Sequence, residues 1–265
     1  MDTGAQYFTL RDAVLRKEIG KVAGAQLKTI PFPILINGKM GEVYREGEER
    51  FYIGSGNNRL GAMLSDGLDV RKEVEVGAVT PVGKEWEVAG DRYDVVVSSA
   101  PWPQSAKILG GSQDGVGYEP NLTALLEYGD GWSGAVYAQI DPSGVDPLSW
   151  VGCENAKAGR VADGSTVYVV QASAKYSREN LEKKPEEWVV DLQLRFEKAY
   201  GVDATKRSQV MSHRWRYARR EKAAGYPGVL PKGVYLCGDS QVDSRLESVW
   251  RSGKETAEKI LGSKA

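Results

Sequence analysis

The sequence has few of the residues from which most small catalytic and metal centres are built. Its 265 residues include one histidine, His213, and two cysteines, Cys153 and Cys237. A Ser-His-Asp triad or a histidine-based metal site would have to use that single imidazole, and the cysteines lack metal-type spacing. We therefore expect no metal and assign no catalytic residue. We expect both thiols to be reduced and buried, as in a cytoplasmic protein.

Long apolar runs and an excess of one charge are also missing. No apolar run approaches the ~20 residues of a membrane-spanning helix, and the start, MDTGAQYFTL, lacks the apolar core of a signal peptide. The 35 basic and 36 acidic residues give a net charge of -1. This balance gives no electrostatic basis for binding nucleic acid or a membrane surface.

One stretch near the C-terminus, GVYLCGDSQVDSRLESVWRSGKETAEKIL, suits a nucleotide-type cofactor. An apolar strand is predicted at 234–237, Gly238 and Asp239 break it, and a helix follows that ends at Gly262. The glycine lets the main chain approach a ligand, the carboxylate accepts from ribityl or ribose hydroxyls, and the helix start offers N–H donors. A strand–turn–helix that merely closes an α/β domain is the alternative. Four apolar residues of the helix are expected to be buried: Val249, Ala257, Ile260 and Leu261.

The rest of the pattern predicts a mixture of helices and strands. Apolar residues recur with helical spacing from about Arg11 to Val22 and from Glu186 to Tyr200. Strands are expected at 6–9, within 30–52, between 68 and 97, and at 135–140, 148–151 and 166–171. The last three indicate an antiparallel sheet. Residues 95–98 and 234–237 are expected to share a second sheet, buried on both faces.

Five segments, in one order along the chain, resemble renalase-like proteins of the amine-oxidase class of FAD enzymes. They are DTGAQYFT at the start, SWV followed by NAKAGR, QASAKYS, HRWRYA, and GVYLCGD followed by SRLESVWRSG. The resemblance runs from Asp2 to about Leu261, with Ala158 and Ser248 standing where the family has proline and glycine. It implies hydride transfer from a reduced substrate to flavin N5 and reoxidation by oxygen to give hydrogen peroxide.

The resemblance also implies which residues contact FAD and substrate. The cofactor residues would be Val76 beside the adenine, then Ala100, Pro101, Gly238, Asp239, Arg245, Leu246, Glu247, Val249 and Trp250. A flat substrate slot could be lined by Tyr7, Trp150 and Trp215, with Arg216 or Arg214 meeting an anionic substrate. A dihydronicotinamide-type molecule and an amine are both open as substrate. The alternatives are that the tryptophans are core residues, that His213 and Arg214 are structural, and that Lys157–Arg160 is a solvated turn.

The family's ADP-binding βαβ unit has no predicted counterpart. The segment Gly54–Arg59 follows a short strand and precedes a helix, but Arg59 replaces the third glycine of G-x-G-x-x-G and no acid follows in register. We interpret this segment as a strand-to-helix return. Leu60, Met63 and Leu64 of the helix are then expected to pack in the fold.

We divide the chain into two interleaved domains of an α/β (α+β) protein. Residues 1–8, 57–109 and 231–265 would form a truncated Rossmann-like FAD-side domain, and residues 9–56 and 110–230 an antiparallel-sheet substrate domain. A second hypothesis treats the absent βαβ unit as decisive. The chain would then be a non-catalytic fragment or one subunit of a split flavoprotein. A partner chain or self-association would supply the nucleotide-binding half.

Overall fold

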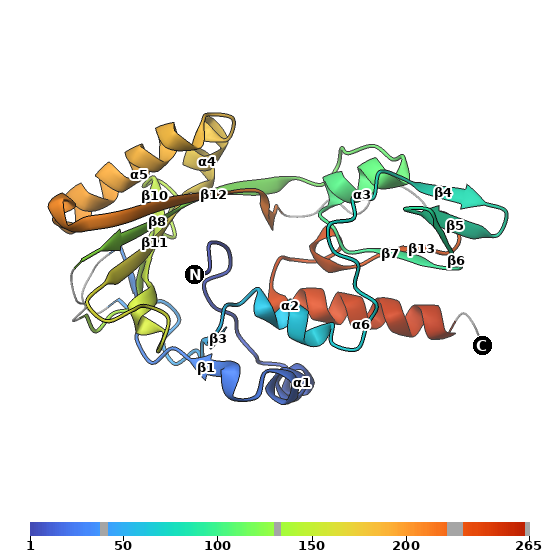
Figure 1. Cartoon of the computed structure of the whole chain (residues 1–265), viewed down its shortest axis with the longest axis horizontal. Helices are drawn as coiled ribbons and strands as arrows, with labels where there is room; N and C mark the ends of the chain where they lie inside the picture. Colours follow the sequence, from blue (N-terminus) through green and yellow to red (C-terminus); the bar gives the residue numbers. More distant parts are fainter. Residues whose placement is uncertain (38–41, 130–133, 222–229, 263–265) are drawn as a thin grey trace. The chain divides into compact units, whose positions relative to one another are not determined.

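The computed structural model describes residues 1–37, 42–129, 134–221 and 230–262. The chain divides into two compact units. Figure 1 labels the elements of both and colours the chain by residue number. Unit 1 contains Met1–Asp66 and Pro120–Ala218, and unit 2 contains Gly67–Glu119 and Arg219–Ala265. This division differs from the predicted domains, because residues 1–8 and 57–66 belong to unit 1, and residues 110–119 and 219–230 belong to unit 2. The roles given to the predicted domains stay predictions.

Unit 1 contains helices on a large sheet. Its helices are α1 (Ala13–Ala23), α2 (Arg59–Leu64), α4 (Ala174–Asn180) and α5 (Pro185–Tyr200). Its strands are β1 (Leu27–Thr29), β2 (Ile34–Ile36), β3 (Phe51–Ile53), β8 (Tyr118–Tyr128), β9 (Ala138–Ile140), β10 (Leu148–Cys153), β11 (Thr166–Ala172) and β12 (Arg207–Arg220). Both β8 and β12 extend for two residues into unit 2.

A six-stranded sheet in the order β12-β8-β11-β10-β9-β2 organises unit 1. Strand β11 pairs antiparallel with β8 and β10, β10 pairs antiparallel with β9, and β2 runs parallel to β9. The predicted mixed α/β class with an antiparallel sheet is therefore confirmed. Strand β9 is shorter than the predicted 135–140, since residues 134–137 precede it without ladder pairing.

The core of unit 1 lies between this sheet and α5. Alternate residues of β8, Leu122, Ala124, Leu126 and Tyr128, point to the side where Trp188, Leu192 and Phe196 of α5 are buried. This alternation is the period-two pattern of a strand that packs on a helix. Helix α5 begins with Pro185 and ends before Gly201, whose φ of 63° suits glycine.

Both predicted amphipathic helices form, but their buried faces are narrower than predicted. In α1, Leu15, Ile19 and Ala23 are buried, whereas Val14 and Val22 are exposed. The buried residues recur every four positions, so the two valines lie to the side of that stripe. In α5, Val190 and Leu194 are exposed for the same reason.

Two smaller expectations in unit 1 are corrected. Residues 6–9 form no strand, and only Phe8 makes a bridge, with Phe51. The neighbouring main chain bonds to side chains instead: the carbonyl of Gln6 accepts from the Tyr137 hydroxyl. In α2, Leu60 is buried but Leu64 is exposed. The predicted Asn37-Gly38 turn falls partly outside the described residues.

Unit 2 is built from two small sheets and two helices. Strands β4 (Val79–Val82), β5 (Glu85–Val88) and β6 (Asp91–Tyr93) form an antiparallel meander. Strands β7 (Val96–Ser98) and β13 (Val234–Leu236) form a parallel pair. The helices are α3 (Trp102–Leu109) and α6 (Leu246–Gly262). Trp102, Ala106, Val116 and Leu236 form the buried core.

The predicted strands between residues 68 and 78 are absent. The meander begins only at Val79, and Leu68, Val70 and Val74 are exposed. A strand needs a hydrogen-bonded neighbour, and the described part of the chain pairs none with this segment. Val76, which was expected beside an adenine, is therefore half-buried in irregular chain rather than in a sheet.

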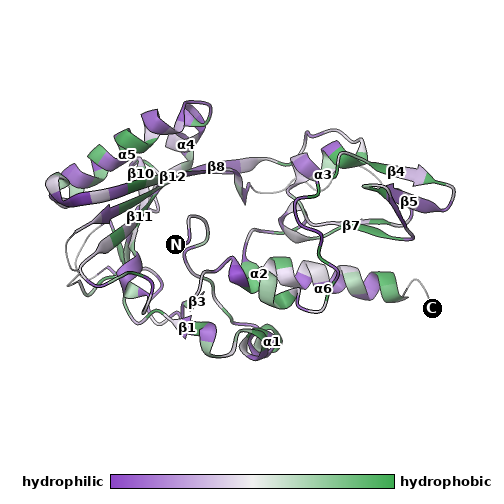
Figure 2. Ribbon diagram, viewed as in Figure 1, coloured by the Kyte–Doolittle hydropathy of each residue, from purple (hydrophilic) through white to green (hydrophobic). Residues whose placement is uncertain are grey.

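Helix α6 is also less buried than predicted. Ser252 is its only buried residue among those described, while Leu261 is 70% exposed and Val249, Ala257 and Ile260 are not buried. Figure 2 shows hydrophobic and hydrophilic residues alternating along α6. The helix meets β13 through polar side chains, since the Thr256 hydroxyl donates to the Leu236 carbonyl at 3.4 Å.

Candidate functional site

The parallel pair β7–β13 brings two predicted segments to one edge of unit 2. Val234 lies opposite Val96 and Leu236 opposite Ser98, and the amide of Cys237 donates to the Ser98 carbonyl at 3.0 Å. Both strands end at the same edge because they are parallel, so the predicted shared sheet is confirmed. The prediction that both faces are buried is wrong, since Val97 is 44% exposed.

Gly238 makes the turn that follows β13. Its φ is 81°, and a Cβ at this position would lie 3.3 Å from the Ser99 carbonyl oxygen. A side chain here would be strained by the backbone conformation and crowded by the chain after β7. The amide of Gly238 donates to the Ser252 hydroxyl of α6 at 3.2 Å. The turn thus brings the chain after β7, the chain after β13 and helix α6 together, as the sequence predicted.

Asp239 follows in the same turn and is half-buried. Its carboxylate accepts from the hydroxyls of Tyr118 at 3.3 Å and Ser244 at 3.4 Å. The Tyr118 hydroxyl accepts in turn from the amide of Trp102, which directly follows Ala100 and Pro101. Burial raises the pKa of Asp239, and burial also raises the pKa of Tyr118 to about 12. Asp239 is therefore linked through the Tyr118 side chain to the chain that directly follows Ala100 and Pro101.

At the start of α6, an acidic and a basic residue of the protein pair with each other. Asp243 accepts from the main-chain amide of Arg245 at 3.0 Å and pairs with its guanidinium at 2.7 Å. This guanidinium lowers the pKa of Asp243 to about 2. Glu247 adds a further carboxylate in the first turn. Arg245, expected to contact a cofactor, is thus already paired within the protein.

The apolar residues expected beside a cofactor lie along α6. Leu246, Val249 and Trp250 are each half-buried, and the Lys254 ammonium lies 5.4 Å from the Trp250 ring centre. All the predicted cofactor residues belong to unit 2. Gly238 and Asp239 lie beside the chain that runs from Ser99 through Ala100 and Pro101 to Trp102, whereas Val76 lies in the irregular segment at 67–78.

The predicted substrate residues all belong to unit 1, and two of them are neighbours. The rings of Tyr7 and Trp150 are 6.0 Å apart, and Tyr137 meets Trp150 edge-on at 5.6 Å. The Arg50 guanidinium lies 5.7 Å from the Tyr7 ring centre. Burial raises the pKa of Tyr7. Trp150 is itself buried, so it serves this aromatic cluster as a core residue.

Trp215 and Arg216 point to opposite faces of β12, as neighbouring strand residues must. Gly4 packs on the Trp215 ring, since a Cβ there would lie 3.1 Å from it. Arg216 pairs with Glu182 at 2.6 Å on the side of α4 and α5, where Arg214 donates to the Lys183 carbonyl. The arginines therefore stand away from the face that carries Trp215 and Gly4. The Trp215 and His213 ring centres lie 4.3 Å apart with the rings tilted by 52°.

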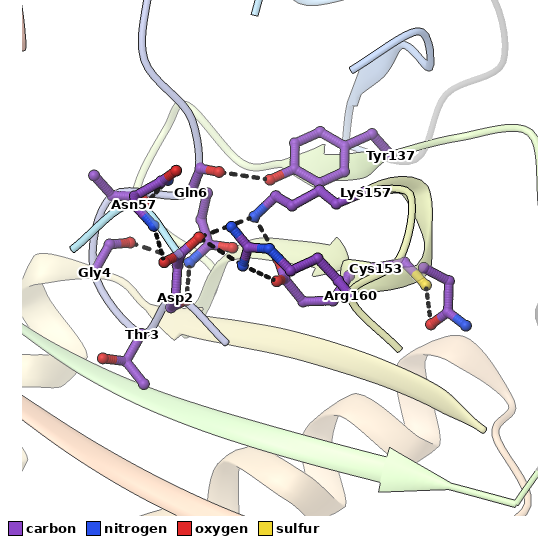
Figure 3. Close-up of polar contacts among 12 residues, drawn as sticks. Asp2, Thr3, Gly4, Gln6, Asn57, Tyr137, Cys153, Lys157 and Arg160 are labelled. Carbon is purple, nitrogen blue, oxygen red and sulfur yellow. Dashed lines mark hydrogen bonds and ion pairs between the residues drawn. The ribbon is translucent and has the colours of Figure 1, made fainter. Parts of the chain in front are cut away.

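A buried ionic cluster in unit 1 was missed by the sequence analysis. The Lys157 ammonium is fully buried and lies 2.5 Å from Glu154, and Arg160 pairs with Glu154 at 3.1 Å and with Asp2 at 2.9 Å (Figure 3). Burial lowers the pKa of Lys157. The expected solvated turn at 157–160 is therefore wrong. Opposite charges spaced three apart, at 154 and 157, were the available signal.

The cluster fixes the start of the chain. Asp2 also accepts from the amide of Asn57 at 2.8 Å, and Gln6 donates back to the Asp2 carbonyl (Figure 3). Thr123 and Gln171 of the sheet donate to the carbonyls of Thr3 and Gly4, at 2.9 Å and 2.7 Å. Residues 2–6, which begin the family-like DTGAQYFT segment, are thus held across the sheet by charge and hydrogen bonds.

The glycine loop at 54–59 has no free donors for a phosphate among its central amides. Ser55 donates to the Gln26 side chain at 3.1 Å, and Asn57 donates to the Asp2 carboxylate. The carboxylate stands where an anion would bind, and the nearby Arg160 is committed to the carbonyls of Ile53 and Gly54. This agrees with its interpretation as a strand-to-helix return.

A literal G-x-G-x-x-G does occur elsewhere, and the sequence analysis passes over it. It reads GDGWSG, from Gly129 to Gly134. It follows β8, but the described chain from residue 134 onward leads to β9 rather than to a helix. A dinucleotide fingerprint opens a helix whose N-terminus meets the pyrophosphate, so the spacing alone does not make this segment one. Residues 130–133 lie outside the described part.

These features can be tested for their fit to FAD. The Gly238 turn, closed to any side chain, and the Asp239 carboxylate fit the ring and ribityl chain of a flavin. The pyrophosphate finds no such fit at the 54–59 loop, whose Ser55 and Asn57 amides already donate within the protein, and at the start of α6 the Asp243 carboxylate engages the Arg245 amide and guanidinium. In the described ranges, no three or more His, Cys, Asp or Glu side chains are grouped to hold a metal ion. Every helix in those ranges is too short or too polar to cross a bilayer.

Comparison with known proteins shows the fold. No family model matches the sequence. The structure matches a protein of Exiguobacterium sp. 255-15 assigned as a protoporphyrinogen oxidase, with a TM-score of 0.64 and 17% identity over 82% of this chain and 53% of that one. It matches cyclohexylamine oxidase of Brevibacterium oxydans IH-35A with a TM-score of 0.60 and 16% identity over 83% and 55%. It matches putrescine oxidase with a TM-score of 0.61 and 12% identity over 81% and 54%. The chain thus has the α/β fold found in these oxidases and spans about half the length of each.

Proposed function

We propose that the chain is part of a flavin-dependent oxidoreductase of the amine-oxidase class. The observation that carries the proposal is the turn at Gly238 and Asp239, set at the shared C-terminal edge of β7 and β13. Its likeness to the renalase-like motif and the fold shared with amine oxidases support the same reading. A flavin bound there would accept a hydride from a reduced small molecule and pass the electrons to oxygen.

The chain's own residues would bind and orient. Gly238 would let the main chain approach the ring, and Asp239 would accept from ribityl hydroxyls. In unit 1, Tyr7 and Trp215 would offer aromatic surface to a flat substrate, while the buried ionic cluster would hold residues 2–6 in place. A dihydronicotinamide-type substrate is proposed from the renalase-like segments, with an amine as the other member of the class. The free thiols of Cys153 and Cys237 support a reducing, cytoplasmic setting.

The test is the rate of flavin bleaching without oxygen. Excess FAD and a dihydronicotinamide or an amine are mixed with and without the purified chain, because free flavin reacts slowly by itself. We expect the chain to accelerate bleaching with one of the substrate classes. Gly238→Ala should lose the acceleration, and Asp163→Asn, an exposed change in unit 1, should keep it. Equal rates with and without protein would contradict the oxidoreductase proposal.

A second candidate is a non-catalytic subunit that needs a partner with a nucleotide-binding half, or a second copy of itself. The observation that favours it is the incomplete burial in unit 2. In its described residues, β13 pairs only with β7, and Leu261, Val97, Val70 and Val74 are exposed. This reading predicts flavin binding without faster bleaching, together with concentration-dependent association in sedimentation velocity. A strictly monomeric chain at all concentrations would count against it.

A further inference from the structure

We propose that this chain recognises only the ring and ribityl part of a flavin, so that riboflavin, FMN and FAD bind to it with similar affinity. The inference rests on the proposed function, because it names the part of the cofactor that the same site takes. It concerns the contacts that unit 2 and the 54–59 loop can and cannot offer.

The first step concerns the acidic residues at the start of α6. The N-terminus of a helix attracts phosphate through its free amides and positive end. Here the Asp243 carboxylate accepts from the Arg245 amide at 3.0 Å and pairs with the Arg245 guanidinium at 2.7 Å. The Asp243 carboxylate therefore engages the Arg245 amide and guanidinium and places a negative charge beside the helix start, where a phosphate would be repelled. Glu247, in the first turn, adds negative charge beside them.

The second step concerns Arg220, a cation near the turn. Arg220 lies near Asp239 and lowers its pKa, an effect that burial exceeds. Its guanidinium donates to the Val242 carbonyl at 3.3 Å, and its amide donates to the Ser244 hydroxyl at 2.9 Å. Arg220 thus bonds to the 242–244 segment, near the Asp239 carboxylate.

The third step is the loop at 54–59 in unit 1. The Gly54 amide donates to the Gln26 carbonyl at 2.8 Å and the Ser55 amide to its side chain. The Asn57 amide donates to Asp2, which Arg160 neutralises. The main-chain amides that could form a phosphate cradle are present, but each of these already donates to an acceptor of the protein.

What remains for a ligand is the Gly238 turn, the Asp239 carboxylate and apolar surface of α6, none of which attracts a phosphate. Gly238 allows close approach of a ring, Asp239 accepts from hydroxyls, and Leu246, Val249 and Trp250 offer half-buried apolar surface. An adenine contact to the main chain of Val76 would change the affinity by less than about tenfold, the effect of one ordinary hydrogen bond. The phosphate groups of FMN and FAD should then add little.

The experiment titrates the full chain with riboflavin, FMN, FAD and ADP, using flavin fluorescence and calorimetry. The expected result is three flavin affinities within about tenfold of one another and no competition by ADP. FAD binding about a hundredfold tighter than riboflavin would overturn the inference and leave the proposed function standing. Absence of binding by all three flavins would overturn both.

A variant tests the role given to the helix start. Asp243→Asn removes the internal anion and frees the Arg245 guanidinium. It should strengthen FMN binding by about threefold to tenfold relative to riboflavin, most clearly at low salt. Asp163→Asn, which removes an exposed carboxylate from unit 1, should leave the ratio unchanged. An unchanged ratio in Asp243→Asn would show that Asp243 does not exclude phosphate.

Discussion

At the scale of single residues, the buried ionic cluster of unit 1 is the most demanding feature to form. Glu154 and Lys157 are fully buried, and Asp2 and Arg160 nearly so. Burying charges costs several kcal/mol per ion, which close pairing and hydrogen bonds only offset when every member is present. The cluster also joins residue 2 to residues 154–160, far apart in sequence. We infer that its main effect is to fix the DTGAQYFT segment.

Lys157→Met should lower the free energy of unfolding by about 3–5 kcal/mol, because it leaves buried carboxylates without one of their cations. The measurement is urea unfolding at neutral pH. Arg216→Met is the matched control, since it breaks an exposed pair with Glu182 and should cost about 1 kcal/mol or less. Adding Glu154→Gln to Lys157→Met should recover part of the loss. A cost for Lys157→Met as small as that of the control would refute the cluster's structural role.

Asp239 is expected to reduce stability at neutral pH. Burial raises its pKa in the folded chain, so the folded state binds the proton more tightly than the unfolded state. Stability therefore falls as the pH rises from about 4 through the raised pKa. Asp239→Asn should be more stable than the parent at pH 7 by a few tenths of a kcal/mol, discounted for its half-exposed position, with no difference below about pH 4. A less stable Asn variant at pH 7 would mean that the bonds from Tyr118 and Ser244 outweigh burial.

At the scale of elements, the strand–turn–helix from β13 to α6 organises unit 2. The parallel pairing with β7 fixes the edge, and the positive φ of Gly238 lets the chain reverse against Ser99. Ser252 and Thr256 then attach α6 by hydrogen bonds rather than by apolar packing. A helix attached in this way keeps Leu246, Val249 and Trp250 available at its surface.

Two glycine substitutions distinguish the constrained turn at Gly238 from the interior of helix α6. Gly238→Ala should cost about 1–3 kcal/mol, because its Cβ meets the Ser99 carbonyl oxygen in a left-handed conformation. Gly253→Ala, in α6 where a Cβ meets nothing within 4 Å, should instead stabilise by about 0.5–1 kcal/mol. Thermal unfolding of both variants measures the contrast. Equal and small effects would mean that the Gly238 turn is not constrained.

Elements with a strong periodic pattern were predictable from the sequence, and those that depend on distant partners were not. Helices α1 and α5, strands β10 and β11, and the pairing of β7 with β13 follow from apolar spacing and turn residues. The strands expected between 68 and 78 fail because the described chain gives them no neighbour. The burial of Lys157 and Arg160 could not be predicted from the local sequence, since it depends on Asp2. The turn at Gly238 was predictable, whereas the commitment of Arg245 to Asp243 required the structure.

At the scale of the whole molecule, the chain has the fold of amine and protoporphyrinogen oxidases over about half their length. In our proposal the Gly238 turn of unit 2 faces the flavin, while donors at the start of α6 and in the 54–59 loop already bond to the protein's own acceptors. Losing charge-assisted contacts worth roughly 1.5–3 kcal/mol each should weaken FAD binding by several orders of magnitude. We therefore expect the chain by itself to exchange flavin readily rather than to retain it.

The most direct measurement is the visible absorbance spectrum of the purified chain, recorded after incubation with FAD and again after desalting. The account predicts that the desalted protein is colourless, because ring and ribityl contacts alone hold flavin weakly. A spectrum with one flavin retained per chain, bleached on addition of a dihydronicotinamide, would contradict it. That result would mean that the chain holds the whole cofactor, phosphates included.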